Sequence, residues 1–352
     1  MSALRQIKRA VLSTSGFGLA PIIARSNWRQ QRLLILCYHG IAEGEEHGSH
    51  PEMFLPPDVF AHRMEVLAQS GCKVVGLGEG LRLLNEGKLP SRSVAITFDD
   101  GWADFPRHAF PVLQKHGFPA TVYLTTYYCL FNRPLFRFAL SHMMWKRQSS
   151  VVENRTFDWL PQQLDLRNES TRSELMWKID DYARTQDFSG KQKDELAAAL
   201  AEMIGFDYAD FCRRRLFQLM TPEEVAATAR GGIDIQLHTH RHRTPLDRDK
   251  FVAEIKQNRD LIVQMTGAHS LTHFCYPSGA IRPDFIPWLK EAGVQSATTC
   301  LNGLATRGGD PYLLPRLLDQ YSLVDSEFES WLTGLAEFLP KRKSVPLDVA
   351  PE

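Results

Sequence analysis

The chain has 352 residues, 43% of them hydrophobic, so it can bury a substantial core as one large α/β domain or two small ones. Lys plus Arg number 41 and Asp plus Glu also number 41, and no long block of one charge sign occurs. This balance argues against nucleic acid as a partner.

Residues 1–30 form a basic, moderately apolar segment. Arg5, Lys8 and Arg9 precede an apolar stretch from Ala10 to Ala24 that superficially resembles a signal peptide, although serines, glycines and a proline interrupt it. A basic amphipathic helix on the domain or in peripheral contact with a membrane is equally expected. Six separate cysteines without a CxxC pair indicate free thiols in a reducing compartment. We predict a cytoplasmic location or one peripheral to the inner membrane, and export stays open.

Residues 31–325 then alternate strand and helix patterns. In chain order we predict a strand at Leu33–Gly40, a helix at Pro57–Ser70, a strand at Cys72–Leu77, a helix around Leu81–Leu84, a strand at Val94–Asp100, a helix at Ala103–His116 and a strand at Ala120–Thr125. This order predicts parallel strands joined by crossover helices.

The pattern changes between about residues 132 and 220. No clear alternating strand is found there, and three helical segments are predicted instead, at Glu174–Thr185, Lys191–Ile204 and Tyr208–Leu219. We interpret this region as a helical insertion between two elements of a barrel.

Strands and helices alternate again after the insertion. The predicted elements are a capped helix from Thr221, a strand at 233–237, a helix at Asp249–Met265, a strand at His273–Tyr276, a helix at Phe285–Ala292 and a strand at Gln295–Cys300. Residues 326–352 are expected to form a closing helix and a polar tail.

Two adjacent carboxylates end the strand that begins at Val94. Asp99 and Asp100 follow a β-branched run and stop at Gly101, so the strand should deliver both acids to its C-terminal end, where α/β folds carry catalytic groups. Neighbouring carboxylates repel each other unless their roles differ. A divalent cation held by one would keep the other ionised as a base.

Two histidines follow the strand at 233–237. His238 and His242 are four residues apart, a spacing that converges on one side of a helical turn or of a strand end that curls into a loop. They are expected at the same sheet edge as the two acids, and together the four side chains predict a metal site.

These residues resemble the motifs of one family. Thr97–Gly101 and the His-Thr-x-x-His spacing at 238–242 look like the first two motifs of the NodB-type polysaccharide deacetylases, and Phe274–Gly279 resembles a later motif of that family. The order and separation match over roughly residues 30 to 325. The resemblance implies a distorted (β/α) barrel interrupted by the helical insertion.

The resemblance also implies roles. Asp100, His238 and His242 would bind a divalent metal, expected to be Zn²⁺, and Asp99 would be the general base. The chemistry alone would allow the two acids to be exchanged.

Four residues are candidates for contact with a sugar. Trp102 and Tyr276 can form apolar walls for a ring or can be packing residues, and both interpretations stay open. Pro277 and Gly279 shape the backbone beside Tyr276.

The sequence departs from the family pattern at two points. Many relatives have an arginine at the position of Cys275 that tunes the catalytic aspartate, and Arg316 is the candidate substitute. The late Leu-x-His motif, whose histidine protonates the departing amine, is missing. His39 is then the nearest candidate for the proton donor, with His273 and metal-bound water as alternatives.

We therefore predict a metal-dependent deacetylase that acts on an N-acetylated sugar, within a cell-envelope polysaccharide or an exopolysaccharide. The first alternative keeps the metal site but changes the substrate to another amide or a cyclic imide. The second is a catalytically silent carbohydrate-binding protein, which the missing arginine and histidine motivate.

Overall fold

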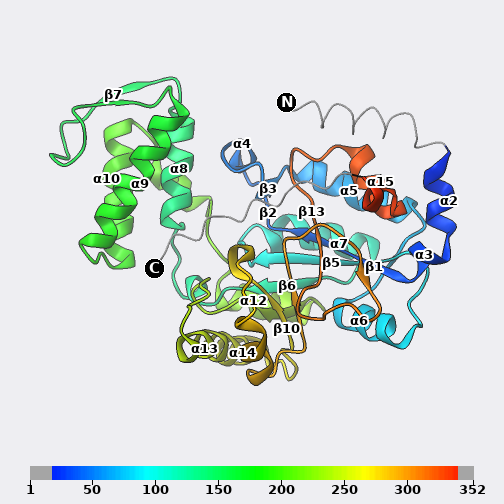
Figure 1. The fold of residues 1–352 in the computed structure, drawn as a ribbon. Coiled ribbons are helices and arrows are strands. Elements are labelled where there is room, and N and C mark those ends of the chain that lie inside the picture. The colour runs from blue at the N-terminus through cyan, green and yellow to red at the C-terminus, as the bar shows by residue number, and fades with distance from the viewer. Residues whose placement is uncertain (1–17, 340–352) are drawn as a thin grey trace.

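The computed structural model describes residues 18–339, which fold around one curled sheet (Figure 1). The strands follow the order β11, β10, β9, β6, β5, β1 and β12, with β4 beside β5 and β13 beside β1. They are β1 (Arg32–Tyr38), β4 (Lys73–Val74), β5 (Ser93–Asp100), β6 (Thr121–Leu124), β9 (Asp234–Leu237), β10 (His273–Cys275), β11 (Ser296–Thr298), β12 (Ala305–Thr306) and β13 (Leu317–Leu318).

Every pairing in this sheet is parallel except that of β1 with β12. Parallel neighbours need long crossover connections, and here most of these are helical. The helices are α5 (Pro57–Gln69), α6 (Leu77–Glu86), η1 with α7 (Phe105–Ala109 and Phe110–His116), α12 (Pro222–Arg230), α13 (Arg248–Thr266), α14 (Phe285–Glu291) and α15 (Asp325–Thr333). This arrangement confirms the predicted distorted (β/α) barrel.

One short segment links the two sides of the sheet. Leu314 forms a parallel bridge with Thr298 of β11, and three residues later Leu317 pairs with Leu36 of β1. The chain between Leu314 and Leu317 therefore lies across the gap between β11 and β1. The sequence did not predict β12 or β13, because two residues are too few to show an alternating pattern.

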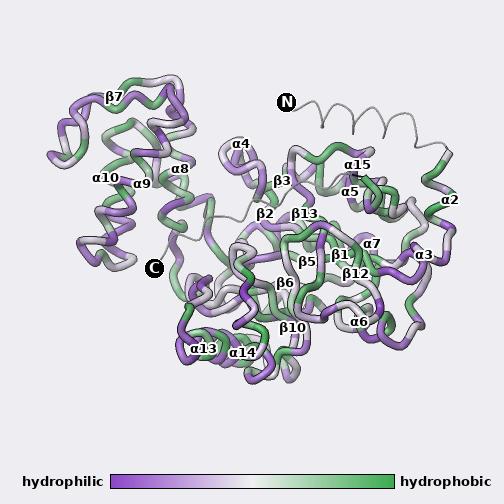
Figure 2. Tube along the Cα trace, viewed as in Figure 1, coloured by the Kyte–Doolittle hydropathy of each residue, from purple (hydrophilic) through white to green (hydrophobic). Residues whose placement is uncertain are grey.

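The central strands are buried on both faces. All eight residues of β5 and six of the seven in β1 are buried, as expected for parallel strands covered on both sides. Figure 2 shows hydrophobic residues concentrated along these strands. The barrel core therefore fixes the C-terminal ends of both strands.

The insertion forms a separate lobe beside the barrel (Figure 1). Its elements are α8 (Phe136–Lys146), β7 (Val151–Glu153), β8 (Gln163–Asp165), α9 (Glu169–Thr185), α10 (Gly190–Ile204) and α11 (Tyr208–Arg213). Helices α8, α9 and α10 contribute most of a second hydrophobic cluster. The predicted helical character is confirmed, but the expectation of no strand was wrong, because β7 and β8 pair as a short antiparallel ladder.

Several element boundaries differ from the prediction, and three of them have a clear structural description. The helix predicted to end at Leu219 ends at Arg213, because Arg215 and Phe217 have positive φ angles that a helix cannot contain. The strand predicted over 72–77 keeps only Lys73–Val74, because α6 begins at Leu77. The helix predicted from Ala103 begins as a π-helical turn at Phe105.

Short elements complete the described chain. They are α2 (Leu19–Arg25), α3 (Asn27–Gln30), β2 (Gly40–Ile41), α4 (Glu46–Ser49), β3 (Phe54–Leu55), η2 (Tyr128–Leu130), η3 (Pro277–Gly279) and η4 (Leu335–Phe338). Residues 1–17 of the predicted N-terminal segment and 340–352 of the predicted tail lie outside the described residues. Within residues 18–339, no helix has both the length and the hydrophobicity needed to cross a bilayer.

Candidate active site

Strand register brings the motif residues to one edge of the sheet. Phe98 pairs with Tyr38, Asp100 with Leu124, and Leu124 with Leu237. The residues that follow these positions, His39 after β1 and His238 after β9, therefore lie at the same edge as the two acids.

The backbone turns sharply where β5 ends. Successive side chains of a strand point to opposite faces, but Asp100 has φ +72° and Gly101 has φ +89°, so the chain bends and redirects the second carboxylate. A Cβ at Gly101 would lie 2.3 Å from a methyl carbon of Leu124. Glycine at position 101 thus suits both the φ angle and the space of this turn.

Asp100 faces both histidines of the second motif. Its Oδ1 lies 3.2 Å from Nε2 of His238 and 3.3 Å from Nε2 of His242. The His238 Nδ1–H donates to the carbonyl of Cys275 at 2.9 Å, which leaves Nε2 as the ring nitrogen that faces Asp100. One oxygen and two imidazole nitrogens, all within 4.8 Å of one another, form a donor set that suits Zn²⁺.

Trp102 anchors the other oxygen of the same carboxylate. Its Nε1–H donates to Asp100 Oδ2 at 3.1 Å, and the indole is 1% exposed. The ring packs edge-on against Phe54 and Phe138, the second of which belongs to the insertion. These contacts support the packing interpretation of Trp102 over a sugar wall open to solvent.

Arg316 forms a bidentate pair with Asp99. Its Nη1 and Nη2 each donate to a different Asp99 oxygen at 2.7 Å, and both side chains are buried. Burial by itself would raise the pKa of Asp99, but the Arg316 charge and hydrogen bonds outweigh it and hold that pKa well below its usual range. The arginine predicted as a substitute for the motif arginine thus contacts the predicted base.

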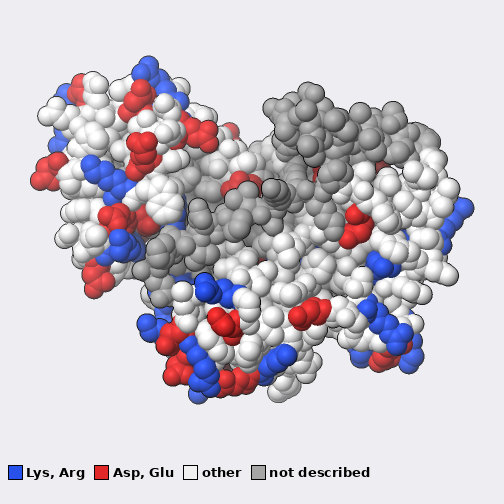
Figure 3. All heavy atoms as spheres, in the orientation of Figure 1, with Lys and Arg blue, Asp and Glu red and all other residues white. Residues whose placement is uncertain are grey.

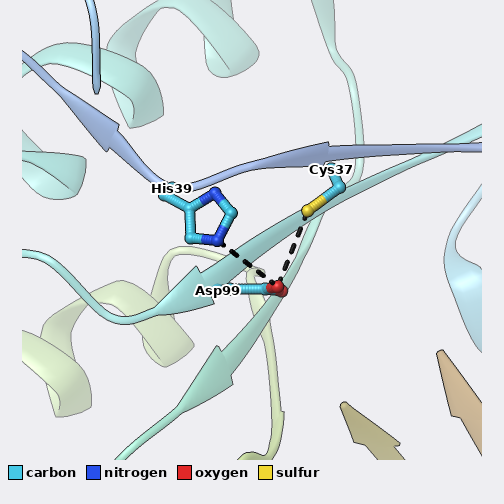
Figure 4. A group of neighbouring side chains, drawn as sticks. All are labelled: Cys37, His39 and Asp99. Atoms are coloured by element: carbon cyan, nitrogen blue, oxygen red, sulfur yellow. Dashed lines mark hydrogen bonds and ion pairs between the residues drawn. The ribbon is translucent and has the colours of Figure 1, made fainter. Parts of the chain in front are cut away.

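His39 and Cys37 approach the same carboxylate from β1 and the turn after it (Figure 4). His39 Nε2 lies 3.8 Å from Asp99 Oδ2, and the Cys37 thiol donates to that oxygen at 3.6 Å. Burial lowers the pKa of His39, although Asp99 and Asp100 oppose the shift. These three side chains are spaced closely enough to bind a cation, but the Arg316 guanidinium already occupies both Asp99 oxygens and would repel one.

The third motif lies directly beside this pair. The Cys275 thiol is 3.4 Å from Asp99 Oδ2 and 3.1 Å from Nη2 of Arg316. The next side chain, Tyr276, is 1% exposed and its hydroxyl donates to the carbonyl of Tyr312. This burial again matches the packing interpretation rather than an exposed sugar wall.

The backbone after Tyr276 is tightly turned. Pro277 begins η3, Ser278 has φ +54° and Gly279 has φ +67°. A Cβ on Gly279 would lie 3.1 Å from the sulfur of Cys300, so glycine suits both the φ angle and the space.

The ring of His273 contacts Ser296 of β11 rather than Asp99 or Asp100. The residue begins β10, two residues before Cys275 ends it, and its Nδ1 lies 2.8 Å from the Ser296 hydroxyl. Of the two histidines considered as proton donors, His39 is the one that lies beside Asp99.

Asn258 is a supporting residue that sequence reasoning missed. Its side-chain oxygen accepts from the backbone N–H of His238 at 3.0 Å, and its amide donates to the Leu124 carbonyl at 2.8 Å. Through these two hydrogen bonds, Asn258 of α13 connects the end of β6 to the residue that follows β9. A buried asparagine on a helix carries no motif that would have identified it.

Curated relatives match parts of the chain. The polysaccharide deacetylase family protein YxkH of Bacillus subtilis is 35% identical over 94 residues, 26% of this chain and 32% of that protein. The poly-β-1,6-N-acetyl-D-glucosamine N-deacetylase of Staphylococcus epidermidis is 39% identical over 67 residues, 19% of this chain and 23% of that protein. The matches thus span about a third or less of each relative's length.

The fold is similar to a solved deacetylase structure. PplD of Streptococcus pyogenes, solved in complex with acetate, has a TM-score of 0.55 and 17% identity, covering 84% of this chain and 96% of that one. The sequence model of the polysaccharide deacetylase family matches residues 86–297, which include all the motif residues described above. The chain therefore belongs to the polysaccharide deacetylase family.

Proposed function

We propose that this protein is a metal-dependent hydrolase that removes the acetyl group from the amide nitrogen of an N-acetylated sugar. One observation carries the proposal: Asp100, His238 and His242 converge as a donor set while Asp99 beside them is held ionised by Arg316. Asp100, His238 and His242 would hold the metal, for which we propose Zn²⁺. When bound, the ion would polarise the amide carbonyl and lower the pKa of water.

Asp99 is the proposed general base. Its lowered pKa keeps the carboxylate ionised near neutral pH, ready to accept a proton from the attacking water. His39 lies 3.8 Å from Asp99 and is the residue placed to pass a proton to the departing amine. The lowered pKa of His39 means that it is neutral in the free protein and must gain that proton during the reaction.

The proposed substrate class is a polysaccharide that contains N-acetylhexosamine, in the cell envelope or in exopolysaccharide. The name of the Staphylococcus epidermidis relative specifies N-deacetylation of poly-β-1,6-N-acetyl-D-glucosamine, and the matched segment makes that polymer the first substrate to test. Another amide or a cyclic imide remains the alternative on the same metal site.

The contacts of Arg316 weaken the case for a silent carbohydrate-binding protein. That alternative was motivated partly by the cysteine at position 275, and Arg316 supplies a guanidinium to Asp99 from a different part of the chain. It still predicts sugar binding without acetate release, and an Asp99→Asn variant that binds as the parent does.

The testing experiment combines metal content with acetate release. Protein purified without chelator is analysed for elements and then incubated with poly-β-1,6-N-acetylglucosamine, N-acetylated chitooligosaccharides and peptidoglycan fragments. The parent should hold close to one transition-metal ion per chain and release acetate. A folded variant with His238→Ala and His242→Ala should lose both, and Asp99→Asn should keep the metal but lose most turnover.

Two results would overturn parts of this proposal. Parent protein that neither contains metal nor takes it up would remove the metal site. Full activity in Asp99→Asn would remove Asp99 as the base.

A further inference from the structure

The two aromatic side chains predicted as walls for a sugar do not face solvent. Trp102 and Tyr276 are each 1% exposed, so neither ring offers a face to a ligand. Within residues 18–339, four other aromatic side chains are at least 43% exposed, and they are Phe131, Trp177, Tyr321 and Phe338. Two of the four, Phe131 and Tyr321, follow strands that end at the edge of the sheet where the acids lie.

Phe131 lies beyond the end of β6, next to the histidine turn. It is 43% exposed, and its ring centroid is 5.0 Å from that of Tyr127. The Tyr127 backbone N–H donates to the carbonyl of His240 at 2.7 Å, and the two rings meet edge-on at 5.5 Å. His240 stands between His238 and His242 in the sequence. Phe131 is therefore linked, through one ring contact and one hydrogen bond, to the turn that carries two of the three proposed metal ligands.

Tyr321 lies beyond the end of β13. It is 48% exposed, its backbone N–H donates to the carbonyl of Pro51 at 3.0 Å, and its ring meets that of His47 edge-on at 5.2 Å. Two residues earlier, the N–H of Asp319 donates to the carbonyl of Cys37 in β1 at 3.0 Å. The chain thus reaches Tyr321 from the C-terminal end of β1, and these contacts hold the residue beside the segment between β2 and β3.

The sheet order places the acids between the two aromatic side chains. Strands β6, β5, β1 and β13 are successive neighbours (Figure 1). The acids end β5 and His39 follows β1, so both lie between the strand that precedes Phe131 and the strand that precedes Tyr321. At about 4.8 Å per strand, the three spacings amount to about 14 Å. This span exceeds the width of one sugar ring, so a chain of several sugar units is needed to contact both.

The chemistry of this edge suits an uncharged sugar polymer. The C–H face of a sugar ring packs on an aromatic ring, and its hydroxyls need polar groups beside that ring. Asn132 follows Phe131, and Tyr321 carries its own hydroxyl. Figure 3 shows Lys and Arg interspersed with Asp and Glu over the insertion lobe and the lower edge of the barrel. Nucleic acid or an anionic membrane would need a field of one sign, whereas a chain of N-acetylhexosamine units does not.

We propose that Phe131 and Tyr321 bind the sugar units on either side of the unit whose acetyl group is removed. The protein then selects chains of several N-acetylhexosamine units over the monosaccharide. This inference rests on the substrate class of the proposed function. It concerns binding, so it does not require the roles proposed for Asp99 and His39.

Binding and turnover of sugars of defined length test this inference on the full chain. The ligands are N-acetylglucosamine and its β-1,6-linked and β-1,4-linked hexamers. Phe131→Ala and Tyr321→Ala are compared with the control Phe338→Ala, whose ring is 61% exposed and contacts Trp28, before β1. Calorimetry measures hexamer affinity with each substitution added to Asp99→Asn, so that turnover does not consume the ligand. Acetate release, melting temperature and metal content are measured with Asp99 intact.

We expect Phe131→Ala and Tyr321→Ala each to weaken hexamer binding about tenfold. Each should also lower kcat/KM on the hexamer about tenfold more than on the monosaccharide, with melting temperature and metal content as in the parent. Phe338→Ala should match the parent throughout. Equal hexamer affinity in all the proteins, or binding of neither hexamer to the parent, would overturn the inference.

The same measurements separate this inference from the proposed function. Hexamer binding that depends on both aromatic side chains, without acetate release from any sugar, would refute the proposed function and support the inference. Acetate release from the hexamer that neither substitution lowers would do the opposite. A parent that dimerises, and a Phe131→Ala or Tyr321→Ala variant that does not, would show that a second copy covers these side chains and would overturn the inference.

Discussion

Arg316 and Asp99 are 217 residues apart in sequence and form a buried pair with two hydrogen bonds of 2.7 Å. Arg316 lies on the segment that fills the gap between β11 and β1, and its Nε donates to the carbonyl of Thr299 at 3.0 Å. This hydrogen bond to the backbone after β11 holds the guanidinium in the orientation in which it contacts the carboxylate. The side chain that sets the ionisation of the predicted base belongs to the segment that links the two sides of the sheet.

Replacing Arg316 with lysine should impair turnover while the metal stays bound. Lysine keeps the positive charge but cannot form the planar fork that contacts both oxygens. The pKa of Asp99 should rise, so the acidic limb of the pH–rate profile should move to higher pH. We expect kcat to fall about tenfold or more, because the fork no longer orients the carboxylate, and the loss should grow as the pH falls.

The matched control for this variant is Arg63→Lys. Arg63 is also buried and pairs with a buried carboxylate, Asp319, on another side of the fold. Its replacement should lower the melting temperature without moving the acidic limb. If both variants leave the acidic limb where the parent has it, Arg316 does not tune Asp99.

Replacing His39 with glutamine should lower kcat about a hundredfold, because general acid catalysis contributes on that scale. Elemental analysis should find the metal content unchanged, since His39 contacts Asp99 and not the three donor residues. His273→Gln is the control, because that ring contacts Ser296 of β11 and not Asp99. A His39→Gln variant whose pH–rate profile matches the parent would exclude His39 as the proton donor.

Replacing Trp102 with phenylalanine should weaken metal binding. The indole N–H holds Asp100 Oδ2, which leaves Oδ1 directed at His238 and His242. Residues that orient a metal ligand in this way typically affect affinity about tenfold or more. Competition with a chromophoric chelator would measure the Zn²⁺ affinity.

Phe54→Leu provides the comparison for Trp102→Phe. It disturbs the same aromatic packing, since the two ring centroids are 5.0 Å apart, but leaves the indole hydrogen bond in place. We expect Phe54→Leu to lower stability with little change in Zn²⁺ affinity. Equal affinity losses in the two variants would mean that packing, and not the hydrogen bond, positions Asp100.

Much of the fold and part of the site could be predicted from the sequence. The strands that end at Asp100 and Leu237 could be predicted from their hydrophobic pattern. Because parallel strands align their C-terminal ends, the two motifs that follow them were expected to meet. The partner of Asp99 could be named only as a candidate, because strands as short as β13 leave no periodic signal. The hydrogen bond from Trp102 depends on a side-chain orientation that no pattern records.

Two histidines, His50 and His142, lie where helix α8 of the insertion meets the barrel, and the sequence did not identify them. The Ser49 hydroxyl lies 2.8 Å from Nδ1 of His142 in α8 and 2.9 Å from Nδ1 of His50. Burial lowers the pKa of His142 to about 3 and that of His50 to about 4. Both rings are therefore neutral at neutral pH, and protonating them in place is unfavourable.

These two histidines should make the stability of the protein sensitive to mild acid. Because the folded-state pKa of His142 is depressed, the unfolded chain binds more protons below pH 6.5, and stability falls as the pH drops. When the pH falls from about 6.5 to about 4.5, His142 alone should lower the free energy of unfolding by about 2 kcal/mol. Urea unfolding at both values should show a smaller loss for His142→Phe, which keeps the ring packing, than for the parent or for exposed His269→Phe. An equal loss in all three proteins would exclude His142 as the acid-sensitive group.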